Sequence, residues 1–600
     1  MCGIIGILGD HQAAPIMVDA LRRLEYRGYD SAGIATVQDG VLDRRRAVGK
    51  LVNLADLLVE QPLRGRAGIG HTRWATHGGP SVANAHPHRA GRVAVVHNGI
   101  IENFRELRAT LDGPWESETD TETIVRLCES YLDQGMPPKE AAFTTVDRLE
   151  GAYALCFLFE GEDDLLIAAR AGSPLAIGHG AGEMFVGSDA IALGPLTDRL
   201  TYLEEGDRAV VTRSGVEIFD AQGGQVQREM RRVRVDAARI EKAGHKHFMA
   251  KEIHEQPQTL KDVLDAYLDD GRIAPPATFD WTGIDRLTIV ACGTAHIAAT
   301  VAKYWFEKIA RLPVECDIAS EFRYRDPVIA PGTAVMVISQ SGETADTLAA
   351  LRHAQGQART LAVVNVAESS IAREAEVAFP ILAGVEIGVA STKAFVNQLA
   401  VLLMLAVRAG LDRGAATAGT EAEWVAKLTA LPGLVSQALA VEDRCEALAH
   451  RLAEATDILF LGRGPMYPLA HEGALKLKEI SYIHAEAYAS GELKHGPIAL
   501  VDRTLPVVVL APTDALFDKT VSNMQEVMAR EGQVLLVTDA EGARRASHGV
   551  WEMLVMPTVD PVLAPILYAV PAQLLAYHTA VHKGTDVDQP RNLAKSVTVE

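Results

Sequence analysis

The sequence has few cysteines, no excess of basic residues and no long unbroken hydrophobic run, and each absence excludes a class of protein. Its six cysteines are scattered without a CxxC pair, so the sequence predicts neither a disulfide framework nor a zinc site and fits a reducing cytosol. The formal net charge of −20 argues against nucleic acid or an anionic membrane as the main partner. An anionic ligand must therefore be held by a local site.

The longest unbroken apolar runs, such as residues 399–407, are well short of the roughly 20 residues that span a bilayer. The apolar stretch at the N-terminus has no basic leader and is too short for a signal peptide. With 48% hydrophobic and 23% charged residues, the composition is typical of a soluble globular chain. We therefore expect a soluble, cytoplasmic protein, and a length of 600 residues predicts two to four domains.

A thiol stands at the second position of the chain. If Met1 is removed, Cys2 carries both a nucleophile and a free α-amine. That amine has a pKa of about 7.7–8.0, so near neutral pH it can act as the general base for its own thiol. Residues 3–7 predict a short buried strand whose glycines let other backbone approach. The alternative is a frayed terminus with a chance cysteine.

The segment 68–78 carries polar residues suited to an amino-acid ligand. Arg73 offers a planar fork of donors for a carboxylate, although it would also suit a surface ion pair. Trp74 lies near Gly78 and Gly79, whose backbone freedom would let a large side chain swing, although a lone tryptophan is more often core packing.

Two further polar positions follow. Residues 93–96 predict a strand that ends in His97-Asn98-Gly99, and an Asn-Gly pair there can present an amide and a backbone N–H as an oxyanion hole. Asp120 precedes a helical run and could hold an ammonium group. The alternatives are a plain turn and a helix cap. Taken together with Cys2 and Arg73, these residues predict a glutamine-hydrolysing site.

The motifs at residues 2–4, 26–30, 71–78 and 97–99 resemble those of the N-terminal-nucleophile glutaminase domain of class II amidotransferases. The resemblance implies a four-layer αββα sandwich. It implies that Cys2 forms a glutamyl thioester and that Asn98 and Gly99 stabilise the oxyanion. The remaining roles that it implies are glutamine binding by Arg73, Thr76, His77 and Asp120, and a channel gate formed by Trp74 and Arg27.

The second part of the chain is an internal repeat. From about residue 285 a strand–glycine loop–helix pattern recurs with a period of roughly 170 residues, which predicts a duplicated α/β domain with a parallel sheet. Matching segments are 287–293 with 458–464, 335–339 with 507–511, and 361–366 with 534–539. The charged, irregular residues 231–246 indicate a linker, and residues 247–257 restart a helix.

The two copies differ in their polar loops. In the first copy, residues 339–347 combine hydroxyls, a glycine and the free N–H groups of a helix start, which predicts a phosphate cradle without a basic residue. Residues 511–514 stand there in the second copy, without the cradle. The alternative for the first copy is ordinary helix capping.

The second copy carries a different set of groups. Helical spacing places Glu472, Lys476 and Glu479 on one face, which could also be an exposed ion-pair face. His495 stands between glycine and proline in the following loop, where a neutral loop histidine is the alternative. The C-terminal residues 584–596 predict no regular element, but they are not of low complexity and look like a segment that folds over a site.

These motifs resemble a pair of sugar isomerase domains, and the whole chain resembles the family of glutamine–fructose-6-phosphate aminotransferases (isomerising). By this resemblance Lys595 forms a Schiff base with the open-chain ketone, and His495 assists ring opening from the neighbouring subunit. Glu479 moves the proton between C1 and C2, with Lys476 in support. The residues implied to hold the sugar phosphate are Thr294, Ser339, Gln340, Ser341 and Thr344, with Val389 and Ser391 nearby.

One position departs from the family pattern: Ala295 follows Thr294 where the family usually has serine. That position cannot donate a hydroxyl hydrogen bond to the sugar phosphate, while the reaction itself is unaffected.

We therefore expect an α/β multidomain enzyme, an αββα glutaminase sandwich followed by two doubly wound sugar isomerase domains. It would convert fructose 6-phosphate and glutamine to glucosamine 6-phosphate and glutamate, with ammonia channelled between the sites, as a cytoplasmic homodimer without metal or cofactor. The expected segments are 2–220 for the glutaminase, 221–250 for the linker, 280–420 and 450–585 for the two isomerase domains, and 586–600 for a tail that closes the sugar site.

Three other functions account for part of the sequence. Another amidotransferase with the same front domain, of the phosphoribosyl-transferring or asparagine-forming type, is disfavoured by the duplicated rear half. A sugar-phosphate-binding regulator would need only the cradle, whereas the chain keeps Cys2, Glu479, His495 and Lys595. A stand-alone glutaminase leaves the rear 350-odd residues unexplained.

Overall fold

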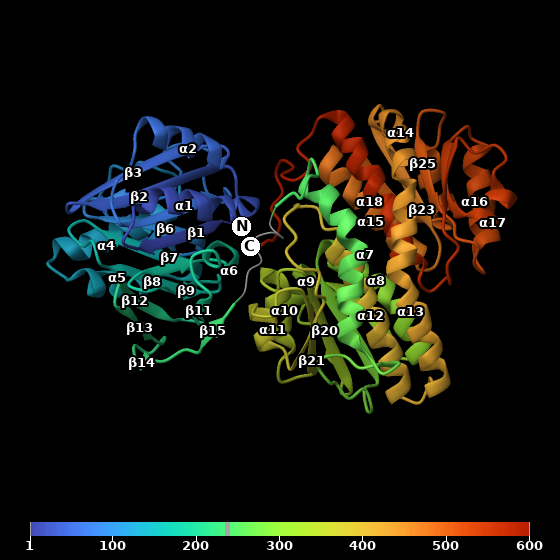
Figure 1. Ribbon diagram of the computed structural model, residues 1–600, viewed down its shortest axis with the longest axis horizontal. Coiled ribbons are helices and arrows are strands. Elements are labelled where there is room, and N and C mark those ends of the chain that lie inside the picture. Colours follow the sequence, from blue (N-terminus) through green and yellow to red (C-terminus); the bar gives the residue numbers. More distant parts are fainter. Residues whose placement is uncertain (1, 234–240, 599–600) are drawn as a thin grey trace. The chain divides into compact units, whose positions relative to one another are not determined.

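The computed structural model describes residues 2–233 and 241–598. The chain divides into two compact units, residues 1–240 with 594–600, and residues 241–593 (Figure 1). Met1, whose removal the expected role of the Cys2 α-amine requires, lies outside the described residues, as do part of the expected linker (234–240) and the last two residues of the tail.

The first unit contains two antiparallel sheets. The eight-stranded sheet has the order β15-β11-β9-β10-β1-β4-β2-β3 and the seven-stranded sheet the order β14-β13-β12-β8-β7-β6-β5. The strands of the first sheet are β1 (Gly3–Leu8), β2 (Ser31–Gln38), β3 (Val41–Val48), β4 (Ala67–Arg73), β9 (Ala176–His179), β10 (Met184–Gly187), β11 (Arg199–Tyr202) and β15 (Met230–Arg232). The strands of the second are β5 (His88–Ala90), β6 (Val93–Ile101), β7 (Gly151–Phe159), β8 (Leu166–Ala171), β12 (Arg208–Thr212), β13 (Gly215–Phe219) and β14 (Gln225–Val226).

Strand β1 shows how the layers form. Because side chains alternate along a strand, Ile4 and Leu8 point into the core between the two sheets, while Ile5 and Ile7 pack under the helices on the outer face. Those helices are α1 (Ala13–Arg22) and α2 (Leu51–Glu60), and α4 (Thr121–Asp133) and α5 (Pro138–Val146) cover the other sheet. The predicted αββα sandwich is confirmed. Two short helices, α3 (Phe104–Ala109) and α6 (Ala190–Leu193), complete the unit.

Strand β6 is longer than the sequence predicts. It continues through Asn98 and Gly99 to Ile101, and these two residues pair with Ala154 and Tyr153 of β7. The Asn-Gly pair is therefore inside a sheet and not at a strand end. Gly99 has a φ of 138°, and a Cβ there would lie 1.9 Å from the carbonyl oxygen of Ala152, so only glycine fits.

The second unit contains two parallel five-stranded sheets of matching order, β19-β18-β20-β21-β22 and β24-β23-β25-β26-β27, which confirms the duplication. The first consists of β18 (Arg286–Ala291), β19 (Val314–Ile318), β20 (Thr333–Ser339), β21 (Arg359–Val364) and β22 (Val377–Pro380). The second consists of β23 (Asp457–Gly462), β24 (His484–Ala489), β25 (Pro506–Leu510), β26 (Gln533–Asp539) and β27 (Glu552–Met556). A small hairpin pairs β16 (Leu268–Asp269) with β17 (Arg272–Ile273).

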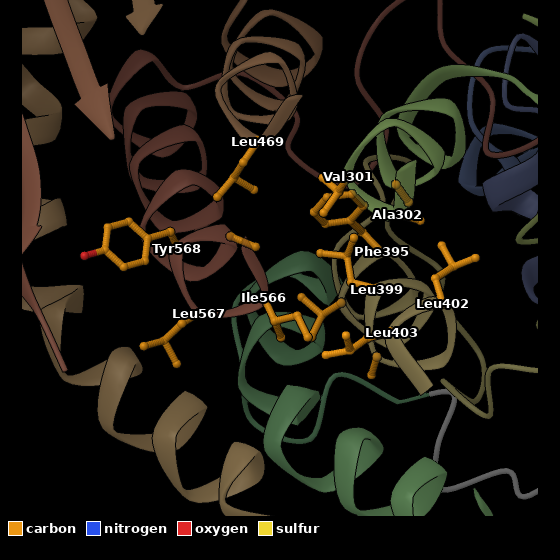
Figure 2. Packing of buried hydrophobic residues seen from close by; sticks show 14 of the residues in the cluster. Val301, Ala302, Phe395, Leu399, Leu402, Leu403, Leu469, Ile566, Leu567 and Tyr568 are labelled. Carbon is orange, nitrogen blue, oxygen red and sulfur yellow. The ribbon is translucent and has the colours of Figure 1, made fainter. Parts of the chain in front are cut away.

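One hydrophobic core joins the two copies. Figure 2 shows Val301 of α8 (Gly293–Trp305), Phe395 and Leu399 of α12 (Lys393–Asp412), Leu469 of α15 (Met466–Ser481) and Ile566 of α18 (Ala564–Lys583) in it. The other helices of this unit are α7 (Phe248–Tyr267), α9 (Ala319–Arg325), α10 (Ala345–Ala354), α11 (Ser370–Glu374), α13 (Ala418–Ala438), α14 (Glu442–Ala453), α16 (Phe517–Met528) and α17 (Ala540–Ala546). The shared core makes the two copies one structural unit.

By length and composition alone, two helical segments could cross a membrane. Neither consists of a single unbroken apolar run of that length. The first, helix α12, has a mean hydropathy of 1.8 over its most apolar window, but 89% of that window is buried inside the unit, so it is a core helix. The second spans Ala418–Ala453, with a mean hydropathy of 1.3 and 28% of its window buried. Length and composition are weak evidence for a membrane span, because core helices of soluble proteins pass the same test.

Candidate active sites

A cleft in the first unit collects most of the residues that the sequence singled out. Its lining includes seven of the predicted residues, Cys2, Arg73, Trp74, Thr76, His77, Gly99 and Asp120. His86, His97, Thr119 and Thr121 also line it. The eighth residue of this group, Asn98, adjoins the cleft, because its side-chain nitrogen donates to the main-chain oxygen of Cys2 at 3.0 Å.

Cys2 is held at the start of β1, where Gly3 pairs with Thr72 of β4. The N–H of Trp74 donates to Cys2 Sγ at 3.2 Å. Burial raises the pKa of the Cys2 thiol, and the Trp74 hydrogen bond and the charge of Arg73 oppose that rise. The thiol therefore needs a base to form a thiolate at neutral pH, which fits the predicted role of a free α-amine.

Arg73 is the last residue of β4, with only 3% of its surface exposed. Its guanidinium donates to the carbonyl oxygens of His77 at 2.6 Å, Gly78 at 2.9 Å and Gly79 at 3.4 Å. Arg73 thus fixes the loop that closes one side of the cleft. Because a guanidinium has five N–H donors, some remain for a carboxylate.

Asp120 is both a cap and part of the cleft. Its Oδ1 accepts from the N–H of Thr121 at the start of α4, and its Oδ2 accepts from the N–H of Ile101 at 2.8 Å. Helix capping is therefore real here, and it also fixes the carboxylate at the end of β6. A carboxylate so oriented can still accept from an ammonium group.

The two gate candidates differ in their surroundings. Trp74 is half-buried and makes an edge contact with Tyr29, with ring centroids 5.7 Å apart. Arg27 is 7% exposed, pairs with Asp189 and donates to the hydroxyl of Tyr26. Arg27 is thus anchored within the first unit, whereas Trp74 lines the cleft itself.

A second polar cluster lies in the second unit, where both repeat copies contribute. Lys476 of α15 is 1% exposed, and its Nζ lies 2.6 Å from Glu479 and 3.5 Å from Glu472. The alternative interpretation, an exposed ion-pair face, is therefore excluded. Burial raises the pKa of Glu472 to about 7; the Lys476 ammonium opposes this rise and Glu479 adds to it. Burial by itself would lower the pKa of Lys476, but the two carboxylates outweigh it and raise that pKa.

The hydroxyl cradle follows β20 as predicted. Ser339 Oγ lies 3.2 Å from Thr344 Oγ1 and accepts from the N–H of Gly342 at 3.0 Å, while Ser341 Oγ accepts from the N–H of Glu343. Thr294 follows the neighbouring strand β18. Since β18 and β20 are adjacent parallel strands from which the chain leaves in opposite directions, their carboxyl ends form the crevice where open α/β sheets bind ligands.

Three buried acidic residues that the sequence did not single out position the loop carrying Val389 and Ser391, two through their carboxylates and one through its main chain. Glu386 accepts from the Ser391 hydroxyl and from the N–H of Thr392, and Glu252 of α7 accepts from the N–H groups of Ile387 and Gly388. The third, Asp588, accepts from the first N–H groups of α7, and its main-chain oxygen accepts from Val389 N–H. Glu252 and Asp588 bond backbone groups more than 100 residues away in the sequence, so no local sequence pattern predicts these contacts.

The remaining predicted residues have these positions. Gln340 is half-buried in the cradle loop, and His495 is exposed in the 3₁₀ turn Glu492–His495. Ala295 packs its methyl group against the core of the second unit. Lys595 is half-buried in the terminal residues 594–600, which belong to the first unit, and its role at the sugar site stays a prediction.

Within residues 2–233 and 241–598, no group of three or more His, Cys, Asp or Glu side chains is arranged to hold a metal ion.

Comparison with known proteins identifies both units. A family model described as a glutamine amidotransferase domain matches residues 76–194, and one described as a SIS domain matches residues 282–408 and 451–583. The chain is 58% identical over 607 residues to the glutamine–fructose-6-phosphate aminotransferase (isomerizing) of Brucella suis, and 58% identical over 608 residues to that of Bradyrhizobium diazoefficiens. In both cases all of each chain is covered. The solved C-terminal domain of glucosamine-fructose-6-phosphate aminotransferase from Francisella tularensis is 45% identical, with a TM-score of 0.57, over 58% of this chain and all of that one.

Proposed function

This chain belongs to the family of glutamine–fructose-6-phosphate aminotransferases (isomerizing), and from that membership we propose how its residues divide the reaction. The reaction transfers the amide nitrogen of glutamine to fructose 6-phosphate and isomerises the product, giving glucosamine 6-phosphate and glutamate. The first unit carries the amidotransferase part and the second the sugar isomerase part. The observation that carries the proposal is the meeting of Cys2, Arg73, Gly99 and Asp120 in one cleft.

In the first unit Cys2 is the nucleophile. With Met1 removed, its α-amine takes the thiol proton, and the thiolate attacks the side-chain amide of glutamine. Asn98 and the Gly99 N–H stabilise the tetrahedral oxyanion. Collapse expels ammonia and leaves a glutamyl thioester, which water then hydrolyses to glutamate. Arg73 binds the α-carboxylate, Asp120 the α-ammonium group, and Thr76 and His77 flank them.

In the second unit the cradle holds the sugar phosphate through the hydroxyls of Ser339, Ser341 and Thr344, with Thr294, Gln340, Val389 and Ser391 around the sugar. Lys595 forms an imine with the C2 ketone, and ammonia replaces the lysine at C2. Glu479 then moves a proton from C1 to C2, with Lys476 beside it, and this converts the ketose imine to the aldose. His495 assists ring opening.

We propose further that ammonia passes to the second site out of contact with water, since free ammonia in water is mostly protonated and no longer nucleophilic. Trp74, Arg27 and the tail 586–600 would gate that passage. The working domains are 2–220, 280–420 and 450–585, with 221–250 as the linker, although β14 and β15 continue the sheets of the first unit into that segment. The protein acts in the cytoplasm as a homodimer in which each subunit supplies His495 to its neighbour.

The test is glucosamine 6-phosphate formation from glutamine and fructose 6-phosphate by the native chain and by Cys2→Ala, each with and without added ammonium. The native chain should form product from glutamine, and Cys2→Ala only from ammonium. If native protein hydrolyses glutamine but never forms the amino sugar, even with ammonium, the assignment of the second unit is wrong.

The homodimer is tested separately by mixing two inactive variants, His495→Ala and Lys595→Ala. Because His495 would act in the neighbouring subunit and Lys595 in its own, mixed dimers contain one intact site. Recovered activity that corresponds to at most about one active site in each mixed dimer supports the shared site. Failure to recover activity after verified subunit exchange contradicts it.

A further inference from the structure

His71 lies buried beneath the catalytic cleft, directly behind Asn98, and has no role in the reaction as described so far. It is in the middle of the eight-stranded sheet, in β4, and 0% of its surface is exposed. Its Nε2 lies 3.0 Å from the main-chain oxygen of His97 and 3.1 Å from Asn98 Oδ1. One ring nitrogen therefore faces two oxygens.

The main-chain oxygen of His97 fixes the protonation of that nitrogen. A carbonyl oxygen only accepts hydrogen bonds, so Nε2 must carry the hydrogen. The N–H then also faces Asn98, so the Asn98 atom beside it must be the carbonyl oxygen and not the NH₂ group. The amide nitrogen of Asn98 consequently faces Cys2, where it donates to the Cys2 main-chain oxygen at 3.0 Å. An NH₂ group has two hydrogens, so the second is available for an oxyanion.

From this geometry we propose that His71 is a positioning residue, whose Nε2–H sets the orientation of the Asn98 amide so that its NH₂ group serves the oxyanion. An amide turned by 180° would present its oxygen to the oxyanion and repel it. The inference deepens the proposed glutamine hydrolysis and rests on it.

The surroundings of His71 keep the ring in this state. Its ring stacks on that of His86, with centroids 4.1 Å apart and an angle of 25° between the planes. Burial, together with the nearby Arg73 and His97, lowers the pKa of His71 to about 3, although its hydrogen bonds to His97 and Asn98 oppose the shift. The ring thus stays neutral and keeps one tautomer at working pH, which suits a fixed donor and not a proton carrier.

Three variants at this position separate donation from packing. The amide of a glutamine reaches as far as Nε2 and can donate to Asn98. The amide of an asparagine reaches only as far as Nδ1, too short to donate to Asn98, and leucine fills the space without any donor. His71→Leu and His71→Asn should lower kcat for glutamine hydrolysis by at least about 10-fold with KM changed less than about 3-fold, since loss of one oxyanion donor costs roughly 100- to 1,000-fold. His71→Gln should recover most of that loss.

A control histidine tests for general damage. His88 is also buried and bonds the Thr119 hydroxyl instead of Asn98, so His88→Leu should retain near-native kcat. Alkylation of Cys2 by iodoacetamide forms no oxyanion, and its rate should be unchanged in every variant that keeps the site intact. Synthesis from added ammonium should also be unchanged, because it does not use this cleft.

A double-mutant cycle with Asn98→Ala gives the decisive comparison. If His71 acts through Asn98, His71→Leu should lower kcat less than about 2-fold once Asn98 is alanine. Additive losses, or a His71→Leu variant as active as the native chain, would overturn the inference. A native chain that hydrolyses no glutamine would instead contradict the proposed function, and the two failures are therefore distinct.

Discussion

Lys476 donates to the hydroxyl of Thr294 at 3.0 Å and thereby connects the two repeat copies, because Lys476 is in α15 of the second copy and Thr294 in α8 of the first. The same hydroxyl also donates to Glu472 at 3.3 Å. Neither copy contains this cluster by itself. The cluster thus combines a hydroxyl group of the first copy with buried charged groups of the second.

Thr294→Val tests that connection. The substitution keeps the shape of the side chain but removes the hydroxyl between two buried charged groups, so we expect a loss of roughly 1–3 kcal/mol in unfolding free energy. The KM for fructose 6-phosphate should rise as well. Denaturant unfolding and steady-state kinetics measure the two effects. Thr300→Val is the matched control, since its hydroxyl on the same helix only donates to the main-chain oxygen of His296. Equal effects in both variants would contradict a special role for Thr294.

Glu472 predicts a dependence of stability on pH. Its pKa is raised from 4.5 to about 7 by burial, so between these values the folded chain keeps a proton that the unfolded chain has released. Stability should therefore fall as pH rises through this window. Glu472→Gln cannot ionise and lacks that fall, so its stability relative to the native chain should improve by on the order of 2–3 kcal/mol between pH 4.5 and 8.

Thermal unfolding of the full chain at several pH values measures this difference. Glu423→Gln, an exposed position on α13, is the control and should differ from the native chain by a constant amount. If the difference between Glu472→Gln and the native chain is also independent of pH, Glu472 is ionised throughout and the prediction is wrong.

Gly99→Ala should abolish glutamine hydrolysis. An added Cβ would lie 1.9 Å from the carbonyl oxygen of Ala152, so β6 and β7 must separate where Asn98 is placed. We expect at least about a 100-fold loss of glutaminase kcat, with ammonium-dependent synthesis retained. Gly135→Ala is the control for backbone strain, since Gly135 also has a positive φ, 86°, but nothing within 4 Å of an added Cβ. It should cost about 1 kcal/mol of stability and little activity. Retained hydrolysis in Gly99→Ala would exclude the proposed oxyanion hole.

Arg73→Lys keeps the charge but loses the planar fork. A lysine cannot hold three loop carbonyls and a carboxylate at once, so the KM for glutamine should rise by at least about 10-fold. Ammonium-dependent synthesis should not change. The control is Arg44→Lys, whose guanidinium contacts Pro87 O and Glu116 at the edge of the same unit. An unchanged KM in Arg73→Lys would show that Arg73 supports the loop only.

Much of the architecture could be predicted from local patterns. The apolar run of residues 3–7 with its two glycines predicts a short buried strand, and the repeated strand–loop–helix pattern predicts a duplicated domain with a parallel sheet; the structure contains both. Such patterns involve only residues close in the sequence, because the backbone geometry of a strand or a helix sets the spacing of its buried side chains. The end of β6 was predicted wrongly, since Asn98-Gly99 is typical of a turn, yet pairing with β7 and the space that only glycine leaves beside Ala152 keep it in the sheet.

The sequence by itself determined the types of group available: a thiol next to the chain start, a hydroxyl loop at a helix start, and an acid–base–acid face on one helix. Only the tertiary structure decided which groups act together. Glu252 and Asp588 hold a loop from positions more than 100 residues away, and the burial of Lys476 turns a helical charge pattern into a dry cluster. The physical reason is that desolvation and hydrogen-bond direction depend on neighbours that chain folding brings together, and spacing along the chain does not encode them.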